Sequence, residues 1–291
     1  FSSRRRHTRF RNVTGVQTCA LPICYVLDVP KVTLIKLNGT LKKGVYARDV
    51  ALMVNGKLGQ RGALGQAIEF GGSYVRDLPM DMRFTLTNTS TEVGAMTGYI
   101  QPDNITLDWC GPRAKRPMVV HETDANFQYE HVHEFDVSAL EPQVAAPHAP
   151  DNVKPLEAVE GTPINQAFLG SCANGRLEDL AAAAAIVKGK KVHPDVRFIV
   201  TPASREIFNA AIRAGYIETL NEANAIVTNA NCGACPGLHG GVLAPGDVAI
   251  ACNTRNFEGR MGPNASIYLA SPAAVAASAL EGKIVNPAKY L

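Results

Sequence analysis

The sequence predicts an α/β protein built on mostly parallel, doubly wound sheets. After Pro163, short apolar segments typical of buried strands alternate with helical segments of about ten residues. The length of 291 residues, of which 46% are hydrophobic, suits about two domains of ordinary size. Doubly wound sheets bind ligands beyond the carboxyl ends of their strands, so residues that directly follow a strand are candidates for function.

The first α/β unit is expected over residues 25–136. Its opening strand is predicted over Val29–Gly39, which ends at an Asn-Gly turn. A helix is predicted over Ala47–Gly56, with Asp49 near its start. Residues 137–162 are rich in proline, alanine and acidic residues, and this composition favours an extended linker.

The second unit is expected over residues 163–291. Its helices are predicted over Leu177–Val187, Ser204–Ala214 and Pro272–Leu280. Its strands are predicted over Val196–Pro202, Ala225–Ala230, Asp247–Asn253 and Ser266–Ala270. Ser271 is expected to cap the last helix, because serine accepts the free N–H groups of a first turn and proline is tolerated directly after it.

The composition favours a soluble, cytoplasmic protein. No uninterrupted apolar run approaches the ~18 residues that a membrane span needs. The net charge is +3, but residues 1–24 contain five arginines and no acid, and the rest has 24 basic and 26 acidic residues. The body therefore offers no electrostatic case for nucleic-acid binding.

Residues 1–24 show no helical or strand periodicity and join the body abruptly at Tyr25. A transit peptide would need an amphipathic stripe, and a nucleic-acid arm would need more length and interleaved aromatic residues. The segment resembles the translated read-through of a sequencing adapter. We interpret it as a non-native leader and expect the natural protein to begin further upstream, so that this chain is a fragment.

Three cysteines mark a candidate metal site in the second unit. Cys232 and Cys235 form a C-x-x-C directly after a predicted strand, and Cys172 follows Gly170 and Ser171 sixty residues earlier. A C-x-x-C lets two thiolates converge on one centre, and a distant third thiolate can complete one face. Structural zinc sites and electron-carrying clusters normally have four protein ligands. Three ligands would leave one iron of a cluster free to act as a Lewis acid.

Other interpretations of these cysteines stay open at this point. His239 would complete a Cys3His zinc site. A thioredoxin-like pair is disfavoured because Pro236 and Gly237 follow the motif in place of a helix start. Cys110 and Cys252 are expected to be small apolar residues of the interior, while Cys19 and Cys24 belong to the leader or its edge.

A loop with two arginines follows the strand predicted over Asp247–Asn253. Arg255 and Arg260 lie five residues apart around Gly259, and each offers a planar fork of donors to carboxylate oxygens. The loop is expected at the same strand-end edge as the cysteines. A thiolate site beside such a pair indicates a small polycarboxylate substrate, although solvated surface arginines are the alternative.

Taken together, these motifs resemble the aconitase superfamily, specifically the large subunit of 3-isopropylmalate dehydratase and homoaconitase-like relatives. The resemblance covers essentially Tyr25–Leu291, and its strongest parts are GSCANGR (170–176), CGACPG (232–237), RNFEGR (255–260) and YLASPAAVAASALEGKI (268–284). It implies aconitase-like α/β/α domains, corresponding to the second and third of the family. It also implies that a first domain and a mobile small domain lie outside this chain.

The resemblance implies a role for individual residues. Cys172, Cys232 and Cys235 would be the ligands of a 4Fe-4S cluster. Arg255, Arg260 and Asn174 would bind substrate, and Glu92 would be a catalytic carboxylate in the cluster pocket, although taken alone Glu92 is typical of a solvent-facing residue near a turn. Ala173 and Thr254 depart from the wording of many relatives, which weakens the choice of substrate.

The activity that the resemblance implies is a hydro-lyase acting on a hydroxy di- or tricarboxylic acid, with 3-isopropylmalate in leucine biosynthesis as the first choice. Homoaconitate, dimethylmalate and citrate are alternatives. The expected partner is a separate small subunit that carries the mobile domain and the catalytic base, so this chain alone is expected to be nearly inactive. A metal- or cluster-binding module without catalysis is the alternative from another class.

Overall fold

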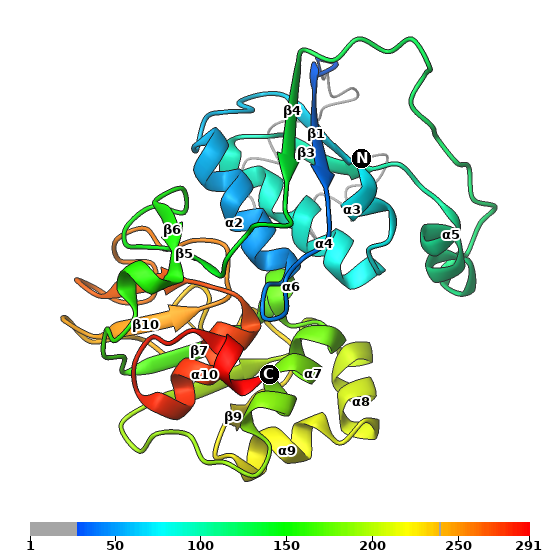
Figure 1. Ribbon diagram of the computed structural model, residues 1–291. Helices are drawn as coiled ribbons and strands as arrows, with labels where there is room; N and C mark the ends of the chain where they lie inside the picture. The colour runs from blue at the N-terminus through cyan, green and yellow to red at the C-terminus, as the bar shows by residue number, and fades with distance from the viewer. Residues whose placement is uncertain (1–27, 239) are drawn as a thin grey trace, which may run out of the picture. The chain divides into compact units, whose positions relative to one another are not determined.

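The computed structural model describes residues 28–238 and 240–291, so the leader, Cys19, Cys24 and His239 lie outside the described residues. The first of its two β-sheets has four parallel strands in the order β3-β2-β1-β4. Strands β1 and β4 of this sheet lie side by side in Figure 1. These strands are β1 (Val32–Asn38), β2 (Ala67–Gly71), β3 (Thr97–Ile100) and β4 (His131–Asp136). The helices that accompany them are α2 (Ala47–Leu58), α3 (Ser73–Arg76), α4 (Met80–Thr89) and α5 (Asn104–Cys110).

The core of this first unit lies between its sheet and its helices. Ile35 and Leu37 of β1 are fully buried, and they belong to the same apolar cluster as Val50 and Val54 of α2 and Leu86 of α4. The predicted strand over Val29–Gly39 and the predicted helix over Ala47–Gly56 are both confirmed, with bounds that differ by a few residues. Burial of the apolar face of α2 thus fixes the orientation of this helix. Its first turn lies near the candidate site.

The second sheet has seven strands in the order β6-β5-β11-β10-β7-β8-β9. Their bounds are β5 (Gln143–Ala145), β6 (Val153–Pro155), β7 (Gln166–Gly170), β8 (Arg197–Thr201), β9 (Ile226–Val227), β10 (Val248–Ala251) and β11 (Ser266–Leu269). The five strands from β11 to β9 are parallel, whereas β5 and β6 run antiparallel. The chain moves outward from β7 to β8 and β9, and then returns to β10 and β11 on the other side of β7. The expected mostly parallel, doubly wound sheet is therefore confirmed.

Helices and loops cover the second sheet. The helices of this unit are α6 (Ser171–Asn174), α7 (Leu177–Val187), α8 (Arg205–Arg213), α9 (Tyr216–Glu222) and α10 (Pro272–Glu281). One apolar cluster joins the strands to α7, α9 and α10, and another joins them to the loops that contain Ala234, Leu243 and Met261. No helix among residues 28–238 and 240–291 is long and apolar enough to cross a membrane.

Most predicted elements of the second unit are confirmed. Helix α7 has the predicted bounds, and the Ser271 side chain caps α10 by accepting the N–H of Ala274. Strand β9 is shorter than predicted because Ile226 and Val227 alone pair with β8 at the edge of the sheet, where the Ile226 side chain is half exposed.

The segment 137–162 differs from the expected linker because it contributes β5 and β6 to the second sheet. Val144 and Ala145 of β5 are fully buried, and Ala145 pairs with Leu269 of β11. Strands of three residues are too short to show an alternating pattern, so the prolines and acids of the segment dominated the sequence-based interpretation.

Candidate active site

The candidate site lies where the winding of the second sheet changes direction, between β7 and β10. Neighbouring strands that lead in opposite directions leave a crevice beyond their carboxyl ends, which is where such sheets bind ligands. Strand β7 leads directly into Ser171 and Cys172, and β10 leads into Cys252 and Asn253. The sequence motifs with thiols and arginines therefore emerge at the switch point of the sheet and beside it.

The Cys172 loop makes a tight turn at the end of β7. Gly170 has φ +150°, and a Cβ there would overlap the carbonyl of Thr201, so only glycine allows the close approach of β7 and β8. Ser171 has a φ of +64°, which is rare for a residue with a side chain. This turn leaves the Cys172 thiol exposed.

A half-buried carboxylate holds the far end of the Cys172 loop. Asp179, in the first turn of α7, accepts the backbone N–H of Arg176 at 3.0 Å and the side-chain amide of Asn174 at 3.2 Å. Burial raises the pKa of Asp179 to about 7, although both hydrogen bonds act in the opposite direction. Asn174, predicted to bind substrate, is itself buried and also lies 3.4 Å from the Thr85 hydroxyl.

The C-x-x-C loop follows β9 and brings Cys232 to the same cavity as Cys172. Both cysteines line a cavity of about 550 Å³, together with Ser204, Arg205 and Asn231 among others. The turn between the two thiols is closed by the Cys235 N–H, which donates to the Cys232 carbonyl at 3.1 Å. Cys172 and Cys232, which the sequence predicts to lie close together, thus line the same cavity.

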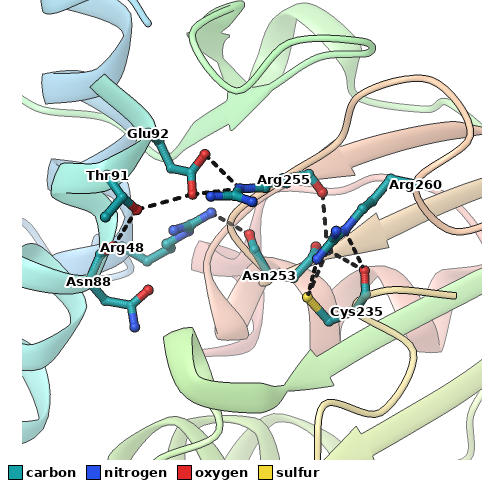
Figure 2. A network of polar contacts seen from close by, with 8 residues as sticks. All are labelled: Arg48, Asn88, Thr91, Glu92, Cys235, Asn253, Arg255 and Arg260. Atoms are coloured by element: carbon teal, nitrogen blue, oxygen red, sulfur yellow. Dashed lines mark hydrogen bonds and ion pairs between the residues drawn. The ribbon is translucent and has the colours of Figure 1, made fainter. Parts of the chain in front are cut away.

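Cys235 is half buried and is not among the residues that line this cavity. Arg260 contacts it twice, through Nε to the Cys235 carbonyl at 2.9 Å and through Nη2 to the Sγ atom at 3.4 Å (Figure 2). The Asn253 side-chain amide lies 3.7 Å from the same Sγ. The arginine loop forms one edge of the site, and Cys235 lies at that edge.

The two arginines of the loop have different partners. Arg255 donates through Nε to both carboxylate oxygens of Glu92, at 3.1 and 3.2 Å, whereas Arg260 contacts Cys235 (Figure 2). Glu92 lies in the 3₁₀ helix η2 (Ser90–Val93), which continues α4. The structure therefore brings predicted residues of both units together, although the arginines do not converge on one point.

Cys252 is buried and structural, as expected from the sequence. Its Sγ accepts the N–H of Gly170 at 3.1 Å and donates to the Asn174 carbonyl at 3.5 Å. Burial raises the pKa of this thiol to about 12. Cys110, at the end of α5, is half buried and lies outside the candidate site.

The fit of the thiols to a metal group depends on the kind of group. All five described cysteines are free, but no three His, Cys, Asp or Glu side chains in the described ranges are arranged to hold a single metal ion. An iron–sulfur cluster binds each thiolate through a different iron, so its ligands need not converge on one atom. Soft thiolate donors at an open cavity fit such a cluster. The alternative zinc ligand His239 lies outside the part of the chain that the structure describes.

Two residues at this site, Arg48 and Asn253, are not predicted from the sequence. Arg48 is 1% exposed and donates through Nη2 to the Asn253 carbonyl at 2.6 Å. In the sequence, Arg48 is only a charged residue among the apolar residues of α2. Such a residue usually lies on a solvated face, so the pattern does not predict its burial. Asn253 follows β10 directly, but an amide after a strand is too common a feature to identify alone.

Comparison with known families gives a match over most of the chain. The model of the Aconitase family (aconitate hydratase) matches residues 15–161 and 154–282, which together include all the candidate site residues. A solved structure, the holo form of aconitase X from Thermococcus kodakaraensis, is similar at a TM-score of 0.43 and 11% identity over 78% of this chain and 50% of that chain.

Curated relatives are similar at much higher identity. A probable methanogen homoaconitase large subunit from Methanothermobacter thermautotrophicus is 50% identical over 89% of this chain and 61% of its own length. The 3-isopropylmalate dehydratase large subunit 1 of Methanopyrus kandleri is 48% identical over 90% and 63%, and the 3-isopropylmalate dehydratase large subunit of Geobacter sulfurreducens is 47% identical over 90% and 64%. The chain thus spans less than two thirds of these relatives. From the family match over both units, we conclude that this chain belongs to the aconitase family.

Proposed function

We propose that this chain is part of a hydro-lyase that removes water from, and returns it to, a hydroxy di- or tricarboxylic acid, with a 4Fe-4S cluster bound by Cys172, Cys232 and Cys235. The observation that carries the proposal is that Cys172 and Cys232, from loops sixty residues apart, line one cavity. Arg255 and Arg260 lie in the loop after β10, and Glu92 of η2 pairs with Arg255.

The thiols supply the ligand chemistry that the proposal needs. Three cysteine ligands leave one iron of the cluster without a protein donor, and that iron can polarise a substrate hydroxyl as a Lewis acid. Cys252 does not compete as a fourth ligand, because its thiol is buried and hydrogen-bonded to the Cys172 loop.

The other proposed residues bind and orient the substrate. Arg255 is the proposed carboxylate-binding residue, since its side chain is 47% exposed while its Nε is fixed by Glu92. Arg260 is likewise proposed to bind a substrate carboxylate, and it also donates to the Cys235 carbonyl and adds positive charge there. Glu92 is proposed as the catalytic carboxylate, and its side chain is 8% exposed. Asn174 is proposed to bind substrate at the end of the Cys172 loop.

The substrate and partner are proposed from the relatives. Two of those described above are named 3-isopropylmalate dehydratase large subunits, and this activity is our first choice. Homoaconitase is the second, because the Methanothermobacter thermautotrophicus relative carries that name at 50% identity. All three are named as large subunits, which supports a separate small subunit as the partner. We assign no general base to this chain.

We propose a domain organisation that follows the two sheets. Residues 25–136 would form the second domain of the family and residues 163–291 the third, which would hold the cluster. The intervening segment 137–162 would join them while also contributing strands to the second sheet.

Anaerobic reconstitution of the chain with iron and sulfide tests the proposal. We expect about four irons per chain and a broad visible absorption band. One zinc per chain with no colour would contradict the proposal and support a metal-binding module without catalysis. Adding both the missing first domain and the small subunit of a relative should then produce dehydratase activity, measured first with 3-isopropylmalate and then with homoaconitate as substrate.

A further inference from the structure

Arg48 is an unusual residue for the interior of a protein. It lies in the first turn of α2 and is 1% exposed, among the largest fully buried side chains of the described residues. Burying a guanidinium is strongly unfavourable unless it is well paired. Burial lowers the pKa of Arg48, while Cys252, Glu92 and Asp49 act in the opposite direction. A residue with this cost is expected to have a specific role.

The contact that Arg48 makes points to that role. Its Nη2 donates to the backbone carbonyl of Asn253 at 2.6 Å, across 205 residues of sequence (Figure 2). Asn253 is fully buried and is the second residue after β10. The first turn of α2 is therefore bonded to the strand end from which the arginine loop emerges.

Asn253 in turn contacts two residues of the site, Cys235 and Arg255. Its side-chain amide lies 3.1 Å from the Arg255 carbonyl, 3.5 Å from the Cys235 carbonyl and 3.7 Å from the Cys235 Sγ. One buried residue thus receives a charge-assisted hydrogen bond from α2 and contacts the loop of a proposed cluster ligand and the loop of a proposed substrate arginine. Charge-assisted bonds are the stronger kind.

We propose that Arg48 is a positioning residue that holds Asn253 and, through it, fixes Cys235 and Arg255 relative to each other. The roles of these two residues rest on the proposed function. The positioning itself is a property of the metal-free chain, so it can be tested separately. Arg48 acts through Asn253 and is not assigned any contact with substrate.

Hydrogen exchange in the metal-free full chain tests the proposal. Arg48→Met should raise amide exchange about tenfold in segments 232–237 and 253–260, because it removes a hydrogen bond to a charged group, and should leave helix α9 unchanged. Arg48→Lys should restore most of the protection, since an ammonium can still donate to one carbonyl. Lys57→Met, on the exposed end of the same helix, is the matched control.

The outcomes decide between positioning and general stability. The proposal is overturned if amide exchange in these two segments rises no more in Arg48→Met than in Lys57→Met. It is also overturned if exchange in Arg48→Met rises equally throughout the chain. If Arg48→Met does not fold, Asn253→Ser decides: it keeps the backbone carbonyl that Arg48 binds and removes the amide contacts. Protection of segments 232–237 and 255–260 must then fall, and unchanged protection overturns the proposal.

Iron loading separates this proposal from the proposed function. If the unaltered chain takes up iron, Arg48→Met should take up less or lose it several-fold faster on exposure to air, and Arg48→Lys should behave like the unaltered chain. If the unaltered chain takes up no iron, the proposed function fails, while the exchange result still decides the role of Arg48.

Discussion

Nε of Arg255 lies 3.1 and 3.2 Å from the two carboxylate oxygens of Glu92, although the two residues are 163 positions apart. The Glu92 side chain is 8% exposed and the Arg255 side chain is 47% exposed. Glu92 is therefore nearly buried, whereas Arg255 is accessible to solvent. Half-exposed ion pairs contribute about 0–1 kcal/mol to stability. The contact is therefore better suited to orienting the guanidinium than to holding the fold.

Arg255→Lys should separate these two roles. The free energy of unfolding should change by less than ~1 kcal/mol, since the ion pair is partly solvated. In the reconstituted enzyme completed with the first domain and the small subunit of a relative, kcat/KM should fall about 10- to 100-fold, because lysine cannot offer two parallel donors to a carboxylate. Steady-state kinetics and urea unfolding measure both quantities. Arg213→Lys, on the exposed end of α8, is the control, and equal kinetic effects in the two variants would contradict the prediction.

Replacing single cysteines should divide the five described thiols into two groups. Cys172→Ser, Cys232→Ser and Cys235→Ser should each lose the visible absorption and most of the iron after anaerobic reconstitution, because serine is a poor ligand for these irons. Cys110→Ser and Cys252→Ser should keep both. The serine hydroxyl at 252 can still accept the Gly170 N–H, so this variant should also fold. Iron retained by Cys172→Ser would count against the proposed cluster.

Gly233→Ala should disturb the C-x-x-C loop. Gly233 has φ +55°, and a Cβ there would overlap the Thr201 hydroxyl and approach the Phe168 ring. We expect a loss of about 1–3 kcal/mol in the free energy of unfolding and reduced iron uptake. Gly240→Ala is the matched control, since nothing lies within 4 Å of its added Cβ. Similar stability of the two variants in urea unfolding would show that the loop accommodates the methyl group.

Because of Asp49, the free energy of unfolding should fall as the pH rises from about 4 to 7. Burial raises the pKa of this carboxyl from 3.8 to about 7, even though the N–H groups of Gln143 and Tyr46 donate to it. Over this range the folded state keeps a proton that the unfolded state releases, so the free energy of unfolding falls with increasing pH.

The variant Asp49→Asn isolates this effect. It should remove up to ~1.4 kcal/mol per pH unit from the slope of stability against pH. Urea unfolding at pH 5, 6 and 7 measures the slope, with Asp195→Asn as an exposed control whose slope should match the unaltered chain. An unchanged slope in Asp49→Asn would mean that Asp49 is already ionised in the folded chain at pH 5.

Local patterns were sufficient for much of the fold. Helix α7 and the capped start of α10 follow from residues adjacent in sequence, because helix propensity and capping act within a few positions. The three cysteines and two arginines were identified for a related reason: each directly follows a strand or lies in its loop, and parallel strands present their carboxyl ends at one edge.

The strands that sequence analysis missed depend on partners far along the chain. Strand β5 has three residues, and its place in the sheet depends on pairing with β11, more than a hundred residues later. Similarly, the pairing of β9 with β8 at the sheet edge, and not its own composition, limits β9 to Ile226 and Val227. Registers of this kind are decided by packing between segments, which a single sequence does not display.

The amino-acid sequence alone determined which chemical groups this protein has and at which strand ends they emerge, since both depend on local patterns. The tertiary structure alone decided that Arg48, from the first unit, is buried against Asn253 and that Arg255 pairs with Glu92. The physical reason is that burying a charge and orienting it require groups from distant segments, and the free energy of such contacts exists only once the whole chain has packed.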